Sequence, residues 1–289
     1  MSHVPSRVLV TGAAGRLGSA VVRVLAGHGV AVVGLDRLDP GTVDAFFAGS
    51  ASDVDLVAKA MAGVDAVIHL AAIPAPDRGT PEDVFVGNSS ATFVVLDQAA
   101  RAGVGRAVIA SSLSITGLPF APRPAVPDYL PIDEAMSLQA ADPYALSKQA
   151  DEATAAMVAR RDGMGVVALR FPKLGSADFL AEYAVEYRER PGAGAHEVWS
   201  YLDMRDAAAA CWLGLTASVA GAHPLYLAAP ETLSPYPTVD LLARYLPGVP
   251  VRVPLTGRAV PIDTSAASAL LGFVPGHLVD IAPAELGPL

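Results

Sequence analysis

Short apolar runs alternate with helical patterns over the first two thirds of the chain, and this order restricts the fold more than any other feature. Strands are predicted at residues 7–11, 31–36, 66–70, 107–111 and 166–170. Helices are predicted between them at residues 16–28, 53–62, 81–102 and 142–161. Such alternation produces a parallel sheet that helices cover on both faces. We therefore predict an α/β fold with a doubly wound parallel sheet over residues 1–170.

The pattern changes after residue 170, where glycine and proline separate shorter elements. These elements are predicted at residues 178–190, 198–202, 203–216, 225–228, 238–246, 251–253 and 265–271. They indicate a small α/β substrate lobe over residues 171–289, partly interleaved with the sheet. Five prolines between Gly117 and Asp142 predict a long ordered loop just before the last helix of the first part.

The composition favours a globular chain that binds neither nucleic acid nor a membrane. Of the 289 residues 52% are hydrophobic and 17% charged, which is enough to bury a large core. The net charge of -9 opposes binding to nucleic acid. The single cysteine, Cys211, cannot form an internal disulfide, and neither a signal peptide nor a membrane-spanning run is visible. We therefore expect a cytoplasmic protein.

Residues 7–18 read as the first strand, a glycine-rich turn and the start of a helix. Gly12, Gly15 and Gly18 have the spacing G-x-x-G-x-x-G. The missing side chains let the backbone turn tightly and approach a pyrophosphate, which binds at the helix N-terminus. A glycine turn by itself is a common strand-to-helix connection. At the start of a series of strands and helices, it predicts a Rossmann-type dinucleotide site.

Asp36 ends the second predicted strand and bears on the choice of dinucleotide. An acidic residue about 20 positions after the glycines holds the ribose hydroxyls of NAD. Its charge would repel the 2′-phosphate of NADP. However, Arg37 follows directly and Arg16 lies in the turn, and either guanidinium can accept that phosphate. The sequence thus favours NAD and leaves NADP open.

Tyr144 and Lys148 lie four residues apart in the predicted helix 142–161, so they share one helical face. Asp142 is a suitable N-cap, and Pro143 suits the first helical position. A free tyrosine titrates near pH ~10 and is a poor base at neutral pH. An ammonium group nearby favours the phenolate, so the pair is predicted to transfer protons.

These segments together resemble the extended short-chain dehydrogenase/reductase family, the NAD-dependent epimerase/dehydratase group. The motifs that carry the resemblance are Thr-Gly-Ala-Ala-Gly-Arg-Leu-Gly at 11–18, Val-Ile-His-Leu-Ala-Ala at 67–72, Asn88, and Ala-Ser-Ser-Leu-Ser-Ile-Thr-Gly at 110–117. The resemblance covers most of the chain and is strongest from Val8 to Lys173. It also implies a homodimer that packs the helices 81–102 and 142–161 of two copies together.

The resemblance implies specific roles for three residues. Ser112 would hydrogen-bond the substrate oxygen, Tyr144 would exchange its proton, and Lys148 would lower the tyrosine pKa and hold the nicotinamide ribose. Hydride would then move between a substrate carbon and nicotinamide C4. The implied cofactor site comprises Gly12, Ala14, Gly15, Arg16, Leu17, Gly18, Asp36, Arg37, Ser50, Ala51, Leu70, Ala71, Ala72, Asn88, Ser111, Tyr144, Lys148 and Pro172. The implied substrate contacts are Ile73, Ser112, Ser114, Lys173 and Arg205.

The chain departs from the family pattern at several positions. Leu113 and Ser114 stand where 4,6-dehydratases carry an Asp-Glu pair, which disfavours the elimination of water. Lys173 stands where nucleotide-sugar enzymes carry an asparagine. Ser50 replaces an aspartate that contacts adenine, and Thr116 replaces a tyrosine. The six histidines, His3 and His69 among them, lack the spacing of a zinc site, so no metal is expected.

Three functions remain open from the sequence. The favoured one is an NAD(P)-dependent oxidoreductase that acts on the hydroxyl or carbonyl of a small polar substrate such as a sugar or sugar acid. An NAD-dependent sugar or nucleotide-sugar epimerase would use the same Ser112, Tyr144 and Lys148. A non-catalytic dinucleotide-binding sensor is the third, and the presence of both Tyr144 and Lys148 disfavours it.

Overall fold

A computed structural model describes residues 4–123 and 125–287. Pro124, one of the prolines of the predicted loop, and His3 lie outside this range. The chain forms two compact units, each assembled from separate segments. Unit 1 comprises Met1–Ser111, Asp142–Leu169 and Ala208–Pro224, and unit 2 comprises Ser112–Ala141, Arg170–Ala207 and Leu225–Leu289. The chain passes between the units several times. The sequence had predicted a boundary after residue 170, with the second lobe partly interleaved with the sheet.

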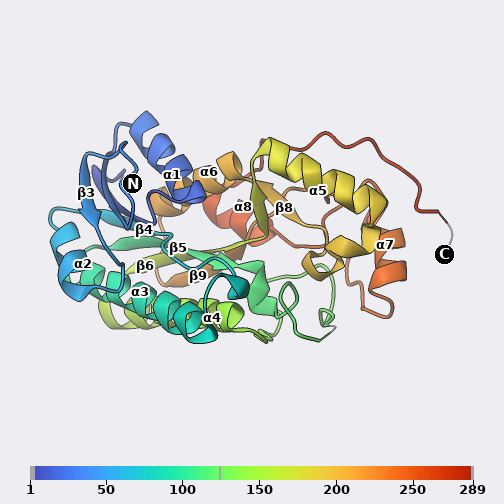
Figure 1. The fold of residues 1–289 in the computed structure, drawn as a ribbon, viewed down its shortest axis with the longest axis horizontal. Helices are drawn as coiled ribbons and strands as arrows, with labels where there is room; N and C mark the ends of the chain where they lie inside the picture. Colours follow the sequence, from blue (N-terminus) through green and yellow to red (C-terminus); the bar gives the residue numbers. More distant parts are fainter. Residues whose placement is uncertain (1–3, 124, 288–289) are drawn as a thin grey trace. The chain divides into compact units, whose positions relative to one another are not determined.

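A seven-stranded, mostly parallel sheet is the centre of the fold (Figure 1). Its strands are β1 (Arg7–Thr11), β2 (Ala31–Asp36), β3 (Ala45–Ala48), β4 (Ala66–His69), β5 (Arg106–Ser112), β6 (Gly165–Phe171) and β9 (Ala222–Tyr226). The order across the sheet is β3-β2-β1-β4-β5-β6-β9. This confirms the predicted doubly wound α/β fold. The chain order reverses between β1 and β4, and ligands of such sheets bind at this switch point, beyond the carboxyl ends of the strands.

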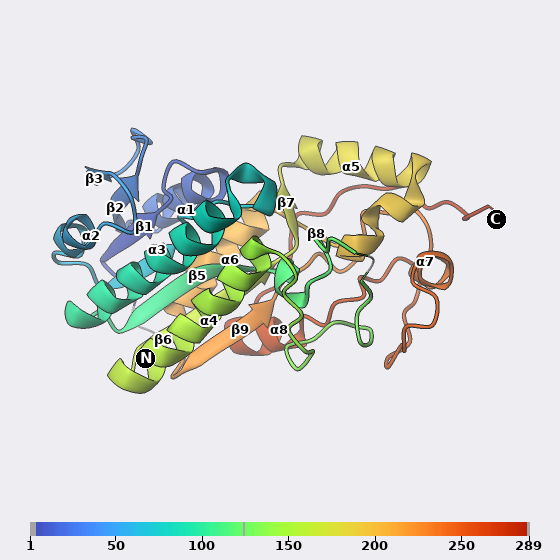
Figure 2. The same ribbon diagram turned by 60° about the horizontal axis from the view of Figure 1, so that its bottom comes forward.

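Helices cover both faces of the sheet within unit 1. They are α1 (Arg16–Gly27), α2 (Val54–Ala60), α3 (Pro81–Arg101), α4 (Pro143–Asp162) and α6 (Met204–Thr216), which belongs to unit 1 from Ala208 onward. Figures 1 and 2 show α3 and α4 running side by side on one face, with α1 on the other. Polar side chains begin three of these helices, since Asp53, Thr80 and Asp142 each accept a backbone N–H of the first turn.

The core of unit 1 lies between the sheet and helices α2, α3 and α4. It contains Leu9, Val33, Val67, Ile109 and Val166 from five different strands, all of them buried. Continuous apolar strands are typical of parallel sheets with both faces covered, and every residue of β6 is buried. Burial of this kind fixes where each strand ends, and so it positions the residues that follow the strands.

Unit 2 has a separate core and shorter elements. They are β7 (Lys173–Gly175), β8 (Tyr201–Asp203), α5 (Ala177–Glu189), α7 (Thr238–Tyr245), α8 (Ser265–Leu271) and the 3₁₀ helices η2 (Leu113–Thr116) and η3 (Pro191–Glu197). Strands β7 and β8 pair in parallel. Trp199, Tyr187, Tyr201 and Tyr226 are its largest fully buried side chains.

Three local predictions for the chain were wrong. Residues 251–253 form neither a helix nor a strand, and only Val251 makes an isolated bridge, to Leu130. Residues 198–200 precede β8 in a left-handed turn, because Val198 and Trp199 have φ of 48° and 53°. β3 had not been predicted, since its sequence Ala-Phe-Phe-Ala is short and lies at the edge of the sheet. These segments depend on tertiary contacts more than on a local pattern.

Asp97 joins α3 to α4 and provides a test of how the two helices are held. Its carboxylate accepts hydrogen bonds from Arg101 Nε at 2.7 Å and from Arg161 Nη2 at 2.9 Å. The Arg101 bond, opposed by burial and reinforced by Arg161, lowers the pKa of Asp97. The carboxylate is therefore charged in the folded protein at neutral pH and lies between two guanidinium groups.

We expect Asp97→Asn to reduce the free energy of unfolding by about 1 kcal/mol at pH 7, the scale of a partly exposed ion pair. Because the folded-state pKa lies below that of the unfolded chain, this stabilisation exists above about pH 4 and is lost as the pH falls through the folded-state value. Urea unfolding from pH 7 to pH 3 measures it. Glu186→Gln, which breaks the exposed pair with Arg190, is the control. Equal stability of the two variants at pH 7 would contradict the assignment.

Candidate active site

The glycine turn between β1 and α1 packs tightly against the backbone around it. Gly12 has φ +70°, and a Cβ there would lie 2.8 Å from the backbone N of Ala71. A Cβ at Gly18 would lie 2.0 Å from the carbonyl oxygen of Gly12. Gly12 O also accepts the N–H of Gly15 at 3.0 Å. Glycine is therefore required at positions 12 and 18, and the turn keeps its backbone free to approach a ligand.

A cavity of about 990 Å³ opens beside this turn, within unit 1. Its lining contains many residues predicted for the cofactor or substrate: Gly12, Ala14, Gly15, Asp36, Arg37, Ser50, Ala51, Leu70, Ala71, Ala72, Ile73 and Asn88. The volume and the glycine-lined wall fit a dinucleotide. Such a cavity at the switch point of the sheet is the expected location of a cofactor in this fold.

Asp36 connects the end of β2 to the glycine turn at the edge of this cavity. One carboxylate oxygen accepts the N–H of Ala14 at 3.0 Å, and the other accepts the N–H of Arg37 at 2.6 Å. The carboxylate is thus fixed where β2 ends and keeps lone pairs for further donors. This arrangement suits ribose hydroxyls, which donate hydrogen bonds, and opposes a phosphate, which carries negative charge.

The cavity also contains residues that the sequence analysis missed. They are Leu35, Leu38, Gly49, Ser52, Arg78, Gly79, Glu82, Asp83, Val86, Gly87 and Ala91. Most lie between η1 (Pro76–Arg78) and the first half of α3. The signal that could have found them is the N-cap at Thr80, which places the start of α3 directly after the segment that follows β4.

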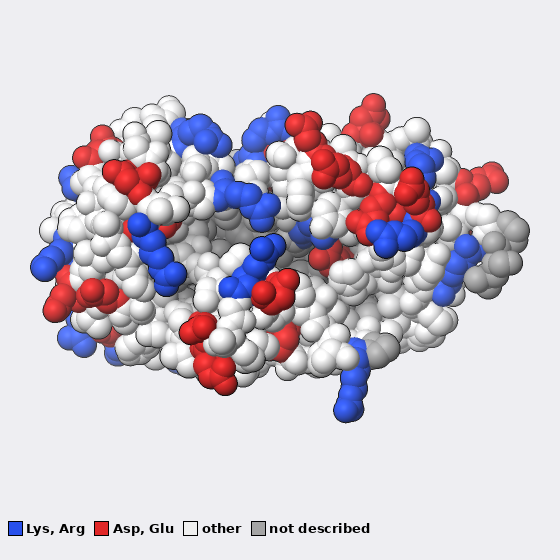
Figure 3. All heavy atoms as spheres, viewed as in Figure 1, with Lys and Arg blue, Asp and Glu red and all other residues white. Residues whose placement is uncertain are grey.

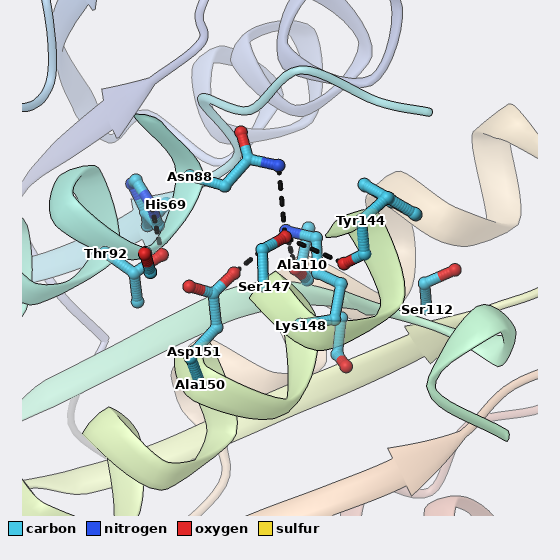
Figure 4. A network of polar contacts seen from close by, with 12 residues as sticks. His69, Asn88, Thr92, Ala110, Ser112, Tyr144, Ser147, Lys148, Ala150 and Asp151 are labelled. Carbon is cyan, nitrogen blue, oxygen red and sulfur yellow. Dashed lines mark hydrogen bonds and ion pairs between the residues drawn. The ribbon is translucent and has the colours of Figure 1, made fainter. Parts of the chain in front are cut away.

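Asn88 ties the segment after β4 to α4. Its side-chain oxygen accepts the N–H of Ile73 at 2.7 Å, and its amide donates to Ile73 O at 3.0 Å and to Ser147 Oγ at 3.2 Å. The side chain is buried, so these bonds are shielded from water. Asn88 therefore holds together two segments that carry predicted site residues, as Figure 4 shows for its bond to Ser147.

Tyr144 and Lys148 lie together on α4, as their spacing predicted. Asp142 caps the helix and accepts the N–H of Tyr144 at 2.8 Å. Lys148 Nζ lies 5.6 Å from the centre of the Tyr144 ring. The same ammonium donates to the carbonyl of Ala110 at 3.0 Å and to the carboxylate of Asp151 at 3.0 Å (Figure 4). Lys148 is thus buried, charged and fixed to β5 beside a phenol.

His69 is a buried histidine whose ring nitrogens both have hydrogen-bond partners. Its Nδ1 lies 2.7 Å from the hydroxyl of Thr11. Its Nε2 lies 3.0 Å from the hydroxyl of Thr92, as Figure 4 shows. Burial, reinforced by the ammonium of Lys148, lowers the pKa of His69 to about 3. The ring is therefore neutral at physiological pH and links β1, β4 and α3 without adding charge.

The remaining predicted residues are placed as follows. Arg16, Leu17 and Gly18 form the first turn of α1, and the hydroxyl of Ser111 donates to Glu152 at 2.6 Å. Ser112 is the first residue of unit 2 and the N-cap of η2, and its hydroxyl accepts from Ser114 Oγ at 2.7 Å. Pro172 is buried in unit 2, between β6 and β7.

The two cations predicted to contact a substrate are paired with carboxylates inside unit 2. Lys173 Nζ lies 2.9 Å from Glu197 and 3.9 Å from the centre of the Tyr183 ring. Arg205 donates two hydrogen bonds to Asp203, at 2.8 and 2.9 Å. Their positive charges are therefore compensated where they stand.

The described residues form neither a membrane-spanning helix nor a cluster of metal ligands. None of their helices is long and apolar enough to cross a membrane. None of their His, Cys, Asp and Glu side chains forms a group of three or more that could hold a metal ion. Acidic and basic side chains are interspersed over the face shown in Figure 3.

Comparison with known proteins identifies the family. The model of the NAD dependent epimerase/dehydratase family matches residues 8–227, which include the glycine turn, Tyr144 and Lys148. The chain belongs to this family. The resemblance stated from the sequence motifs is thereby confirmed, and NAD is the cofactor of the family.

Relatives within the family carry out different reactions. A UDP-glucose 4-epimerase of Azospirillum brasilense is 30% identical over 182 residues, which are 60% of this chain and 50% of that protein. An L-arabinose 1-dehydrogenase (NAD(P)(+)) of Haloferax volcanii is 32% identical over 187 residues, 61% of this chain and 70% of that protein. The chain thus spans half the length of the epimerase it matches.

A solved structure covers nearly the whole chain. It is a short-chain dehydrogenase/reductase superfamily protein from Agrobacterium tumefaciens with bound NAD, with a TM-score of 0.72 and 27% identity. The match covers 94% of this chain and 93% of that one. It agrees with the parallel sheet and the flanking helices described above.

Proposed function

We propose that the chain is an NAD(P)-dependent oxidoreductase that acts on the hydroxyl or carbonyl carbon of a small polar substrate. The observation that carries the proposal is the arrangement of Tyr144 and Lys148 on α4, with Lys148 fixed to Ala110 and Asp151. In this arrangement the Tyr144 hydroxyl would exchange a proton with the substrate as general acid and base, and the ammonium of Lys148 lies beside its ring.

The residues of unit 1 fit the cofactor of the family. The glycine turn would hold the pyrophosphate at the start of α1, and Asp36 would accept the hydroxyls of the adenine ribose. The bound nicotinamide supplies or accepts the hydride. Tyr144 would give a proton to the substrate oxygen or take one from it. The role of Ser112, a hydrogen bond to the substrate, stays what the family resemblance implies. The charge of Asp36 favours NAD over NADP, although Arg37 lies next to it in the cavity wall.

We further propose that the substrate is uncharged, within the class of sugars and lactols. Lys173 and Arg205, the two cations predicted to contact the substrate, already pair with Glu197 and Asp203. An anion would have to break these ion pairs or leave its own charge without a partner. Hydroxyl groups would instead form hydrogen bonds with such pairs at little cost.

Epimerisation of a sugar is the second candidate, and the likeness to the Azospirillum epimerase favours it. An epimerase would use Tyr144 and Lys148 in the same way, but hydride would return to the substrate within one turnover. The net change of the nicotinamide therefore separates the two functions.

A homodimer through α3 and α4 also stays a prediction. Phe93 on α3 and Leu146 on α4 expose apolar side chains that it would cover.

The test is an absorbance assay with NAD and NADP side by side, over a panel of neutral sugars, sugar acids and UDP-sugars. We expect net formation of NADH with a neutral sugar and a lower kcat/KM with the corresponding acid. Conversion of a UDP-sugar with no net change in absorbance would establish the epimerase instead. Tight NAD binding without turnover of any compound would point to a dinucleotide sensor.

A further inference from the structure

Asp151 forms a buried ion pair with the lysine of the proposed catalytic pair. It follows Lys148 by three positions on α4, and its carboxylate lies 3.0 Å from Lys148 Nζ. The two side chains are 4% and 1% exposed, so water does not screen the pair. Figure 4 shows the ammonium between this carboxylate and the carbonyl of Ala110.

The pair determines how the lysine can act. An ammonium has three donors, and Asp151 and Ala110 accept from two of them, which fixes the direction of the third. Burial by itself works to lower the pKa of Lys148, but the carboxylate of Asp151, followed by Tyr144 and Glu152, raises it above its usual value. A buried ammonium without such a partner would release its proton far more readily.

Other groups near Lys148 do not replace Asp151. Glu152 accepts a hydrogen bond from Ser111 at 2.6 Å. His69, on β4, is neutral over the pH range of an assay, because its pKa is about 3. Thr92, on α3, adjoins the carboxylate of Asp151 and stabilises its charged form, although burial raises the pKa of Asp151. Asp151 is therefore the charged group that contacts Lys148 directly.

We propose that Asp151 is a positioning residue of this enzyme, which keeps the Lys148 ammonium charged and fixed against β5 so that it can support proton transfer by Tyr144. The inference rests on the proposed function for its catalytic consequence. Asp151 is not among the residues predicted from the sequence motifs, although its i, i+3 spacing from Lys148 places both on one helical face.

The test is Asp151→Asn in the full chain. Asparagine has nearly the same shape, and its amide oxygen still accepts a hydrogen bond from Lys148, so the substitution removes the charge alone. We expect the pH above which kcat falls to shift down by about one to three units, the usual effect of one nearby charge. The apparent KM for NAD at pH 7 should change little. Asp162→Asn, on the same helix and paired with Arg161, is the matched control and should leave the profile in place. A profile for Asp151→Asn that overlays that of the wild type would overturn the proposal.

Stability measurements test the pair without a substrate. We expect Asp151→Asn to lower the urea midpoint, since it leaves a buried ammonium without a compensating charge. The double variant Lys148→Met/Asp151→Asn should restore part of the loss. The third member of the cycle is Lys148→Met alone. If the stability lost by the double variant equals the sum of the losses of the two single variants, the charges are not coupled and the proposal fails. A wild-type protein that turns over no substrate would refute the proposed function, whereas the stability cycle would still report on Asp151. The two failures can therefore be distinguished, even where a single variant folds poorly.

Discussion

Tyr144→Phe is expected to reduce kcat by about a hundredfold to ten-thousandfold, the usual contribution of a positioned general acid or base. Phenylalanine keeps the ring beside Lys148 but has no proton to exchange. Because the substitution removes only the hydroxyl and leaves the glycine turn and Asp36 unchanged, the affinity for NAD should stay close to that of the wild type. Steady-state kinetics with the substrate found in the panel, together with a fluorescence titration of NADH, measure both effects.

Tyr236→Phe is the matched control for this variant. It also removes one phenol, but the hydroxyl of Tyr236 donates to the carbonyl of Arg188 at 2.8 Å, in unit 2. We expect normal turnover and a slight loss of stability. If Tyr144→Phe retained wild-type kcat, another group would be the acid and base, and the proposed mechanism would be wrong. If Tyr144→Phe lost NAD binding and turnover in parallel, the role of the tyrosine would be to bind the cofactor rather than to transfer a proton.

The sequence predicted the parts of the site that are local. The i, i+4 spacing of Tyr144 and Lys148, with Asp142 as the cap, was enough to place the pair on one helical face. The glycine spacing was likewise enough to predict the turn between the first strand and the first helix, because these three parts are continuous in the chain. Asp36 was predicted from its position at the end of the next strand. Strands buried on both faces can also be recognised in the sequence, because they contain few polar residues.

The parts that depend on tertiary pairing could not be predicted in this way. Lys173 was predicted as a substrate contact, and the structure adds a partner that the sequence did not indicate, Glu197, 24 positions later. No periodicity connects these two residues, because η3 separates β7 from β8. The same holds for Asn88, whose partners Ile73 and Ser147 lie 15 and 59 positions away. A sequence pattern shows which groups need partners, and packing decides which partners they obtain.

Gly18→Ala is expected to have the second large effect, although it adds only one methyl group. The new Cβ would lie 2.0 Å from Gly12 O and 2.9 Å from the Cα of Ala13. Both are backbone atoms, so no side chain can move aside to relieve the clash. The turn must open, and Gly12 O also accepts the N–H of Gly15. We therefore expect a loss of about 1–3 kcal/mol in the free energy of unfolding, as for other overpacked sites.

The same variant should weaken NAD more than about tenfold, since a loss of ~1.4 kcal/mol in binding is enough for that. The pyrophosphate needs the turn and the first N–H groups of α1 in one arrangement, and opening the turn displaces them. Gly27→Ala, at the other end of α1, is the matched control, because a Cβ there meets nothing within 4 Å. It should bind NAD normally and gain up to about 1 kcal/mol from better helix propensity. Calorimetry and thermal unfolding of both variants separate the outcomes: if Gly18→Ala bound NAD as tightly as Gly27→Ala, the glycine turn would not be the pyrophosphate site.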